Sequence, residues 1–194
     1  LNLNLLADSE PGGSTTPDTN GAGDAEDVAE ELAADNPPQQ TGTASPDDSA
    51  KRWNATQKMF IRLLQALGDA SLSLEEAMAL TDAVTDFIDR DAERRLNGAE
   101  EGDYRYADYP YLPANRALAS VSELRAVRGM TEPVYRALAP LVTVWPETSG
   151  RLNILTCPLP VLRSVNGDDQ LSPMNEIEAQ RLDELRREGE ILTV

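Results

Sequence analysis

The chain has 194 residues, which is enough for one substantial domain or for one domain and a disordered segment. It contains no histidine and a single cysteine, Cys157, so an intramolecular disulfide, a multi-cysteine metal site and imidazole chemistry are excluded. The formal net charge is −17, of which residues 1–50 contribute −11 and residues 51–194 contribute −6. A surface of this sign repels phosphates, so we expect no nucleic-acid partner.

The first fifty residues divide into two parts. Leucine and asparagine alternate at the start of residues 1–6 (LNLNLL), and this period of two predicts a half-buried strand. Residues 7–50 are rich in Gly, Pro, Ser, Thr and acidic residues and contain no aromatic residue, which predicts a disordered acidic insertion. Within it, only residues 25–34 could form a short helix.

Apolar residues recur at helical spacing in four segments and predict helices over residues 59–67, 73–88, 120–128 and 131–141. Ser73 and Glu76 have the spacing of a capping box, which marks the start of the second helix. Gly68 and Gly129 follow the first and third helices, where a glycine commonly ends a helix. We therefore expect a largely helical block in the middle of the chain.

The C-terminal part returns to an extended pattern. Residues 151–156 (RLNILT) repeat the alternation seen at the N-terminus and predict a second strand. Residues 175–188 predict an amphipathic helix, and residues 191–194 a further short strand. Two similar strands that bracket a helical block indicate an α+β fold, in which a helical domain is inserted into a β-containing one.

No apolar run approaches the roughly 18 residues that a membrane-spanning helix needs. The first residues also lack the basic flank of a signal peptide. We therefore expect the chain as given to be soluble.

Carboxylates gather where the second predicted helix ends. The stretch Asp86–Asp91 (DFIDRD) is followed by Asn97–Tyr104 (NGAEEGDY), and residues 89–109 form a predicted loop. Oxygen ligands on a glycine-broken loop are what Ca²⁺ requires, although the spacing does not match an EF-hand. Ordinary ion pairs with the nearby arginines remain the alternative, whereas zinc is disfavoured because nitrogen and sulfur donors are lacking.

Several segments of the sequence, taken in order, resemble the K-class minor pseudopilin of the type II secretion system. These segments are LNLN at residues 1–4, DFIDRD at 86–91, the acidic loop, ANRALASVSEL at 114–124, VRGM at 127–130, LAPLVTVWP at 138–146 and LNILT at 152–156. The resemblance covers residues 1–6 and most of residues 53–165. Residues 7–50 and the stretch Thr156–Pro158 depart from the family pattern.

The resemblance implies a pilin-like β-sheet portion with a large inserted α-helical domain. Residues 1–6 would be a strand of the sheet, residues 7–50 an insertion particular to this chain, and residues 51–147 the helical domain. Residues 148–194 would return to the pilin-like portion and end in a helix. The family's N-terminal transmembrane helix, and part of its C-terminal portion, are expected to be absent from this chain.

The resemblance also implies partners, location and a metal. Family members lie at the tip of a periplasmic pseudopilus with the I- and J-class pseudopilins, anchored in the inner membrane, and support the export of folded exoproteins. They are associated with calcium in the loop that corresponds to residues 89–103. The residues of this chain that match as ligands are Asp89, Asp91, Glu100, Glu101, Asp103 and Asn115.

Two other classes of function stay open at this point. One is a stand-alone calcium-dependent module that binds an exoprotein without the other pseudopilins. The other is a hydrolase that uses a carboxylate pair such as Asp168 and Asp169; we do not expect an enzyme, because paired surface acids are common and nothing marks a cleft. The segment 124–130 resembles a helix-hairpin-helix, but in an acidic domain a packed hairpin is favoured over DNA binding.

Overall fold

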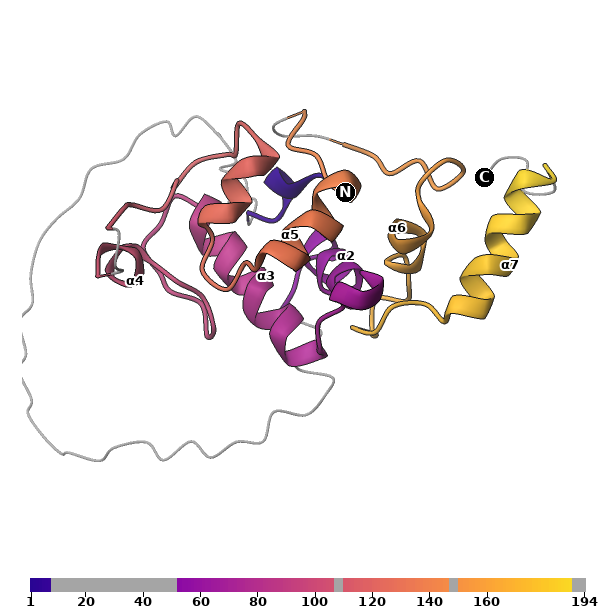
Figure 1. The fold of residues 1–194 in the computed structure, drawn as a ribbon, viewed down its shortest axis with the longest axis horizontal. Coiled ribbons are helices and arrows are strands. Elements are labelled where there is room, and N and C mark those ends of the chain that lie inside the picture. Colours follow the sequence, from indigo (N-terminus) through magenta and orange to yellow (C-terminus); the bar gives the residue numbers. More distant parts are fainter. Residues whose placement is uncertain (8–51, 107–109, 147–149, 190–194) are drawn as a thin grey trace, which may run out of the picture.

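The computed structural model describes residues 1–7, 52–106, 110–146 and 150–189. Two helices, α2 (Ala55–Leu64) and α3 (Leu74–Ile88), pack against each other at its centre (Figure 1). Each begins at a capping box, formed by Asn54 with Gln57 and by Ser73 with Glu76, so the predicted start of the second helix is confirmed. Gly68 has a φ of 64°, a left-handed conformation that turns the chain between the two helices.

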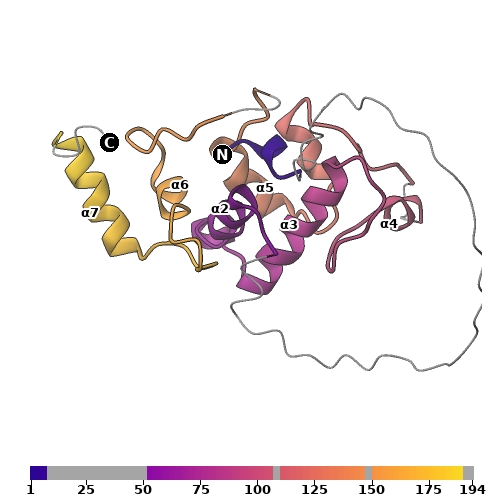
Figure 2. The same cartoon turned by 180° about the vertical axis from the view of Figure 1, so that it is seen from behind.

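Shorter elements surround this pair. They are the α-helices α4 (Glu101–Arg105), α5 (Glu132–Leu138), α6 (Leu159–Arg163) and α7 (Glu176–Arg187), and the 3₁₀ helices η1 (Leu3–Leu5), η2 (Gly68–Ala70), η3 (Val121–Ala126) and η4 (Ala139–Leu141). Helix α4 lies at one end of the molecule and α7 at the other, as the two opposite views show (Figures 1 and 2). None of the helices in the described ranges is long and apolar enough to cross a membrane.

One hydrophobic core joins the N-terminal segment to the helices. Leu3 and Leu6 are fully buried together with Phe60 on α2, Val84 on α3 and Leu138 on α5. Because Leu3 and Leu6 enter the same core as the helices, this first segment is a structural part of the helical body. The boundaries proposed at residues 51 and 147 stay a prediction.

The predicted strand over residues 1–6 is wrong. Within the described ranges no strand is present, and this segment forms an isolated parallel bridge between Asn2 and Thr143 followed by η1. The polar positions of the alternation do not face water, because Asn4 is buried and its Nδ2 donates to the carbonyls of Leu118 and Val144 at 3.0 Å. The period of two therefore reflects buried asparagines that bind backbone groups.

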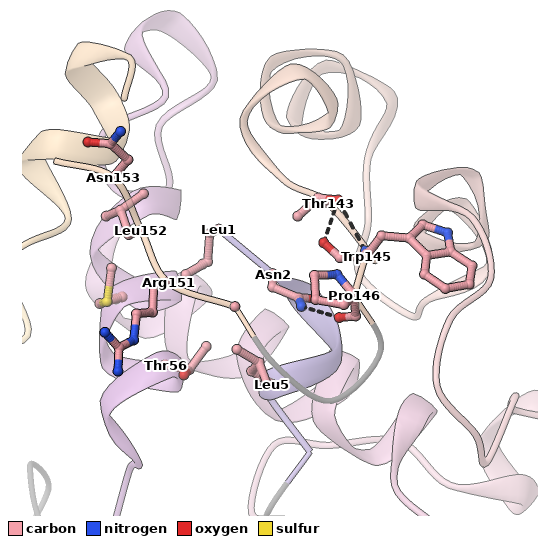
Figure 3. Close-up of a pocket in the computed structure, with 12 residues that line it drawn as sticks. Leu1, Asn2, Leu5, Thr56, Thr143, Trp145, Pro146, Arg151, Leu152 and Asn153 are labelled. Carbon is pink, nitrogen blue, oxygen red and sulfur yellow. Dashed lines mark hydrogen bonds between the residues drawn. The ribbon is translucent and has the colours of Figure 1, made fainter. Parts of the chain in front are cut away.

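The second predicted strand, over residues 151–156, is also wrong. Asn153 accepts a hydrogen bond from the N–H of Leu155 through its side chain, and its carbonyl accepts from the N–H groups of Thr156 and Cys157. This local bonding favours a turn over a ladder. Residues 151–153 line a pocket of about 320 Å³ together with Leu1 and Asn2, without forming a strand pair with them (Figure 3).

The remaining predictions have mixed outcomes. The predicted C-terminal helix is confirmed as α7, and Thr131 stands at the N-cap of α5 as expected. The segment predicted as an α-helix over residues 120–128 is the 3₁₀ helix η3. The possible helix at residues 25–34 and the strand at residues 191–194 lie outside the described residues.

A buried guanidinium connects α2 to the C-terminal part of the chain. Arg62 is 2% exposed and donates from Nε to the carbonyl of Gln170 at 2.8 Å. Its two Nη atoms donate to the carbonyls of Ser164, Gly167 and Gln170 at 3.2, 2.5 and 2.6 Å. A single planar side chain thus satisfies three carbonyls of one loop.

We predict that Arg62→Met lowers the free energy of unfolding by about 2–3 kcal/mol, because three partly or fully buried carbonyls lose their donor. Urea denaturation measures the difference. The matched control is Arg136→Met, whose exposed side chain pairs, within the described ranges, only with Glu132 and whose removal should change the free energy by about 0.5 kcal/mol at most. Equal effects of the two substitutions would contradict the proposed anchoring.

Candidate functional site

Helix α3 places three carboxylates on one face. Asp82, Asp86 and Asp89 are four and three residues apart, a spacing that aligns them along the helix. Asp82 and Asp86 are completely buried and Asp89 is 8% exposed. Because a buried charge is costly without compensation, the segment that covers this face has to supply donors or cations.

The loop that follows α3 folds back over this face. The N–H of Asn97 donates to Asp82 and the N–H of Arg95 to Asp86, both at 3.2 Å. Gly98 lies so close that an added Cβ would stand 1.8 Å from Oδ2 of Asp86. Only glycine fits at this position, so the Asn97-Gly98 turn expected from the sequence has a second reason: the close approach of the loop to α3.

Three acidic residues meet where the loop returns. Asp89, Asp91 and Glu100 each contribute a carboxylate oxygen, and these oxygens lie within 4.8 Å of one another. Asp89 ends α3, Asp91 is exposed two residues later, and Glu100 is the N-cap of α4. We call these three residues the acid cluster.

The acid cluster contains polar atoms that the described part of the chain leaves unsatisfied. Oδ1 of Asp89 and both carboxylate oxygens of Glu100 are buried without a hydrogen-bond partner there. Asp89 and Glu100 are each only 8% exposed. Buried acceptors without a donor are rare in native proteins, and an ion at the site is one of their ordinary explanations.

Burial and mutual repulsion shift the titration of these groups. Burial, with the charges of Asp91 and Asp86, raises the pKa of Asp89 to about 7. Burial also raises the pKa of Glu100 to about 7, with Asp86 and Asp91 as further causes. The pKa of Asp86 is raised to about 6, mainly by burial, although the N–H and guanidinium of Arg95 oppose the shift. The site therefore favours either protons or a cation.

The donors fit a hard divalent cation. Ca²⁺ takes six to eight oxygen ligands in flexible geometry, so three carboxylates could hold it if backbone carbonyls and water complete the shell. The acid cluster offers no nitrogen or sulfur donor, which disfavours zinc. The residues present thus fit the calcium ion that the resemblance implies.

The other predicted ligands lie in different surroundings. Glu101 pairs with Arg105 on the same helix. Asp103 pairs with Arg128 at 2.7 Å and is not one of the three residues whose carboxylate oxygens lie within 4.8 Å of one another. Asn115 is exposed and has a φ of 43°, and its N–H donates to the carbonyl of Phe87 in the last turn of α3 at 3.0 Å. These three residues stay predictions as ligands.

Sequence reasoning included Asp86 in the carboxylate stretch and the nearby arginines as ion-pair partners, but it missed Asp82 and the complete burial of Asp82 and Asp86. The signal was present, because aspartates at positions 82, 86 and 89 follow the same helical spacing as buried apolar residues. Acidic residues at the buried positions of a helix indicate that other groups compensate their charge, and a cation in the following loop can do so.

Comparisons with known proteins identify the family of the chain. Residues 1–147 match the model of the family described as type II secretion system (T2SS), protein K. The chain therefore belongs to the type II secretion system protein K family.

Relatives and one solved structure support the same family. The chain is 36% identical over 110 residues to type II secretion system protein K of Klebsiella pneumoniae, covering 57% of this chain and 33% of that protein. It is 35% identical over 124 residues to the Pseudomonas aeruginosa protein, covering 63% of this chain and 36% of that protein. The chain thus spans about a third of the length of these curated relatives.

The solved structure is the GspK–GspI–GspJ complex of the enterotoxigenic Escherichia coli type 2 secretion system, with a TM-score of 0.51 and 26% identity. The match covers 64% of this chain and 42% of the solved chain.

We predict that, in chelator, the protein becomes less stable as the pH rises from about 4 to about 8. The pKa values of Asp86, Asp89 and Glu100 are raised in the folded state, so folding is favoured while these groups hold protons and loses that advantage as they ionise. Urea unfolding across this range measures the trend. The double variant Asp89→Asn/Glu100→Gln should show a flatter profile, and an unchanged profile would contradict the assignment.

Proposed function

We propose that this chain is part of a K-class minor pseudopilin at the tip of a periplasmic pseudopilus. The membership of the type II secretion system protein K family carries the proposal. The likeness to the K subunit in a solved complex with GspI and GspJ supports I- and J-class pseudopilins as its partners. In this role the protein primes pseudopilus assembly and supports the export of folded exoproteins.

The whole protein, of which this chain corresponds to about a third of the length in its relatives, would be anchored in the inner membrane and face the periplasm. The pilin-like β-sheet belongs to this proposal. The family consists of structural components of a secretion system, so the proposal assigns no reaction and no catalytic residue to the chain.

The acid cluster has a structural task in this proposal. A calcium ion held by Asp89, Asp91 and Glu100 would satisfy buried oxygens and fix the loop of residues 90–100 to the end of α3. Glu101, Asp103 and Asn115 are further candidate ligands that a rearrangement of the loop could bring in. The ion would compensate the negative charges and link the two ends of the loop. It would have no catalytic role.

We predict that calcium raises the melting temperature of the metal-free protein at pH 8. An ion that binds only the folded state stabilises it by about 2.7 kcal/mol at one hundred times its dissociation constant, which corresponds to roughly 5–10 °C for a domain of this size. Thermal unfolding with calcium and with chelator measures the shift.

The double variant Asp89→Asn/Glu100→Gln should lose the calcium response while it melts higher than the wild type in chelator, because the repulsion is gone. The matched control is Glu93→Gln, an exposed acid of the same loop that lies outside the acid cluster. This control should respond to calcium like the wild type. A wild-type protein that shows no shift, in material proven free of metal, would remove the site.

We predict that the whole K-class protein co-elutes with the soluble domains of its I- and J-class partners in size-exclusion chromatography. The assembly should form with wild-type protein and calcium. A K-class protein that never co-elutes with both partners would contradict the proposed function. An exoprotein bound in their absence would instead support the stand-alone binding module.

A further inference from the structure

Of the three carboxylates along α3, Asp82 pairs with Arg52, whereas Asp86 and Asp89 both pair with Arg95. The Nε of Arg95 is 3.3 Å from Oδ1 of Asp86, and its Nη2 is 3.8 Å from Oδ2 of Asp89. The side chain is 20% exposed, so solvent screens its charge only in part. No other cation of the described ranges pairs with either aspartate.

The neighbouring Arg94 differs in its surroundings. Its side chain is 53% exposed, and its Nε donates to the carbonyl of Gly98 at 3.0 Å. Its carboxylate partner is Asp103 at 3.7 Å, which lies outside the acid cluster. Two consecutive arginines of one loop therefore face different carboxylates, and only Arg95 reaches a member of the acid cluster.

We propose that Arg95 is a built-in counter-ion that competes with the bound calcium ion for Asp89 and thereby sets the affinity of the site. The proposal rests on the calcium site proposed above. Without the ion, the guanidinium compensates Asp86 and Asp89 and keeps the loop on α3. With the ion, the same positive charge repels a divalent cation across Asp89, so part of the binding free energy is lost.

This arrangement has a defined physical consequence. Charges of +1 and +2 about 6 Å apart repel by about one decade of binding constant when the effective dielectric constant is close to that of water. Within the described ranges Arg95 is the only cation that pairs with Asp86, so the guanidinium can keep this contact while Asp89 turns to the ion. Calcium binding thus replaces Arg95 by the ion at Asp89, and both Asp86 and Asp89 keep a positive charge beside them before and after binding.

The test compares charge removal with charge retention at one position. Arg95→Met keeps the apolar stem and removes the charge, and Arg95→Lys keeps the charge but not the guanidinium. Isothermal titration calorimetry with calcium chloride at pH 8 should show about tenfold tighter binding for Arg95→Met. Arg95→Lys should stay within about threefold of the wild type. The control, Arg94→Met, should change the affinity by about twofold at most because that side chain is mostly screened.

Stability gives an independent readout. In chelator, Arg95→Met should melt below the wild type, since Asp86 and Asp89 lose their counter-charge. In saturating calcium most of this deficit should disappear, so the calcium-induced rise in melting temperature is larger in the variant than in the wild type. If Arg95→Met does not fold in chelator, NMR of the wild type decides: the Nε–H signal of Arg95 should shift when calcium is added.

The measurements distinguish a failure of the calcium site from a failure of the role of Arg95. A wild type that binds no calcium overturns the proposed site. A wild type that binds, together with an Arg95→Met variant of equal or weaker affinity, overturns the role of Arg95 and leaves the site standing. An Nε–H signal of Arg95 that does not respond to a bound ion has the same meaning.

Discussion

Helix α3 buries three carboxylates along one face, and each charge removed from water has to be compensated by a donor or a cation. The loop after the helix is shaped by this requirement. Its backbone N–H groups bind Asp82 and Asp86, its glycine at position 98 permits the close approach, and its Arg95 supplies positive charge. At the end of the row Asp89 meets Asp91 and Glu100, and buried oxygens of Asp89 and Glu100 have no hydrogen-bond partner in the described ranges. The candidate cation site is therefore a part of this polar network in which buried carboxylate oxygens still lack a donor or a cation.

Elsewhere in the fold, too, buried polar side chains form hydrogen bonds with the backbone of distant segments. Asn4 joins the N-terminal segment to the chain at Leu118 and Val144, and Arg62 joins α2 to the loop around Gln170. Such contacts are specific in direction, whereas apolar contacts are not. The short helices α4, α5 and α6 have few residues with which to bury apolar surface, so these contacts help to define how the segments are arranged.

The sequence allowed the helices to be predicted better than the rest. The capping box at Ser73 is a local signal, and α3 begins where it predicted, whereas α2 ends at Leu64 with Gln65 as its C-cap, before the glycine at position 68 that was expected to end it. The strands failed because alternation cannot distinguish an asparagine that faces water from one that binds buried carbonyls, as Asn4 does. The acid cluster was partly predictable, since Asp89, Asp91 and Glu100 are close in sequence. The pairing of Asp103 with Arg128 and the placement of Arg95 depend on tertiary contacts, which no local pattern contains.

In the proposed role at the tip of a periplasmic pseudopilus, a calcium ion held by the acid cluster would fix the loop after α3. Crystals grown with calcium, measured for anomalous scattering, test this proposal most directly. We expect a peak within about 2.3–2.6 Å of oxygens of Asp89, Asp91 and Glu100. A fully ordered loop without a peak at these residues would contradict it, and so would an ion held only by Glu101 and Asp103.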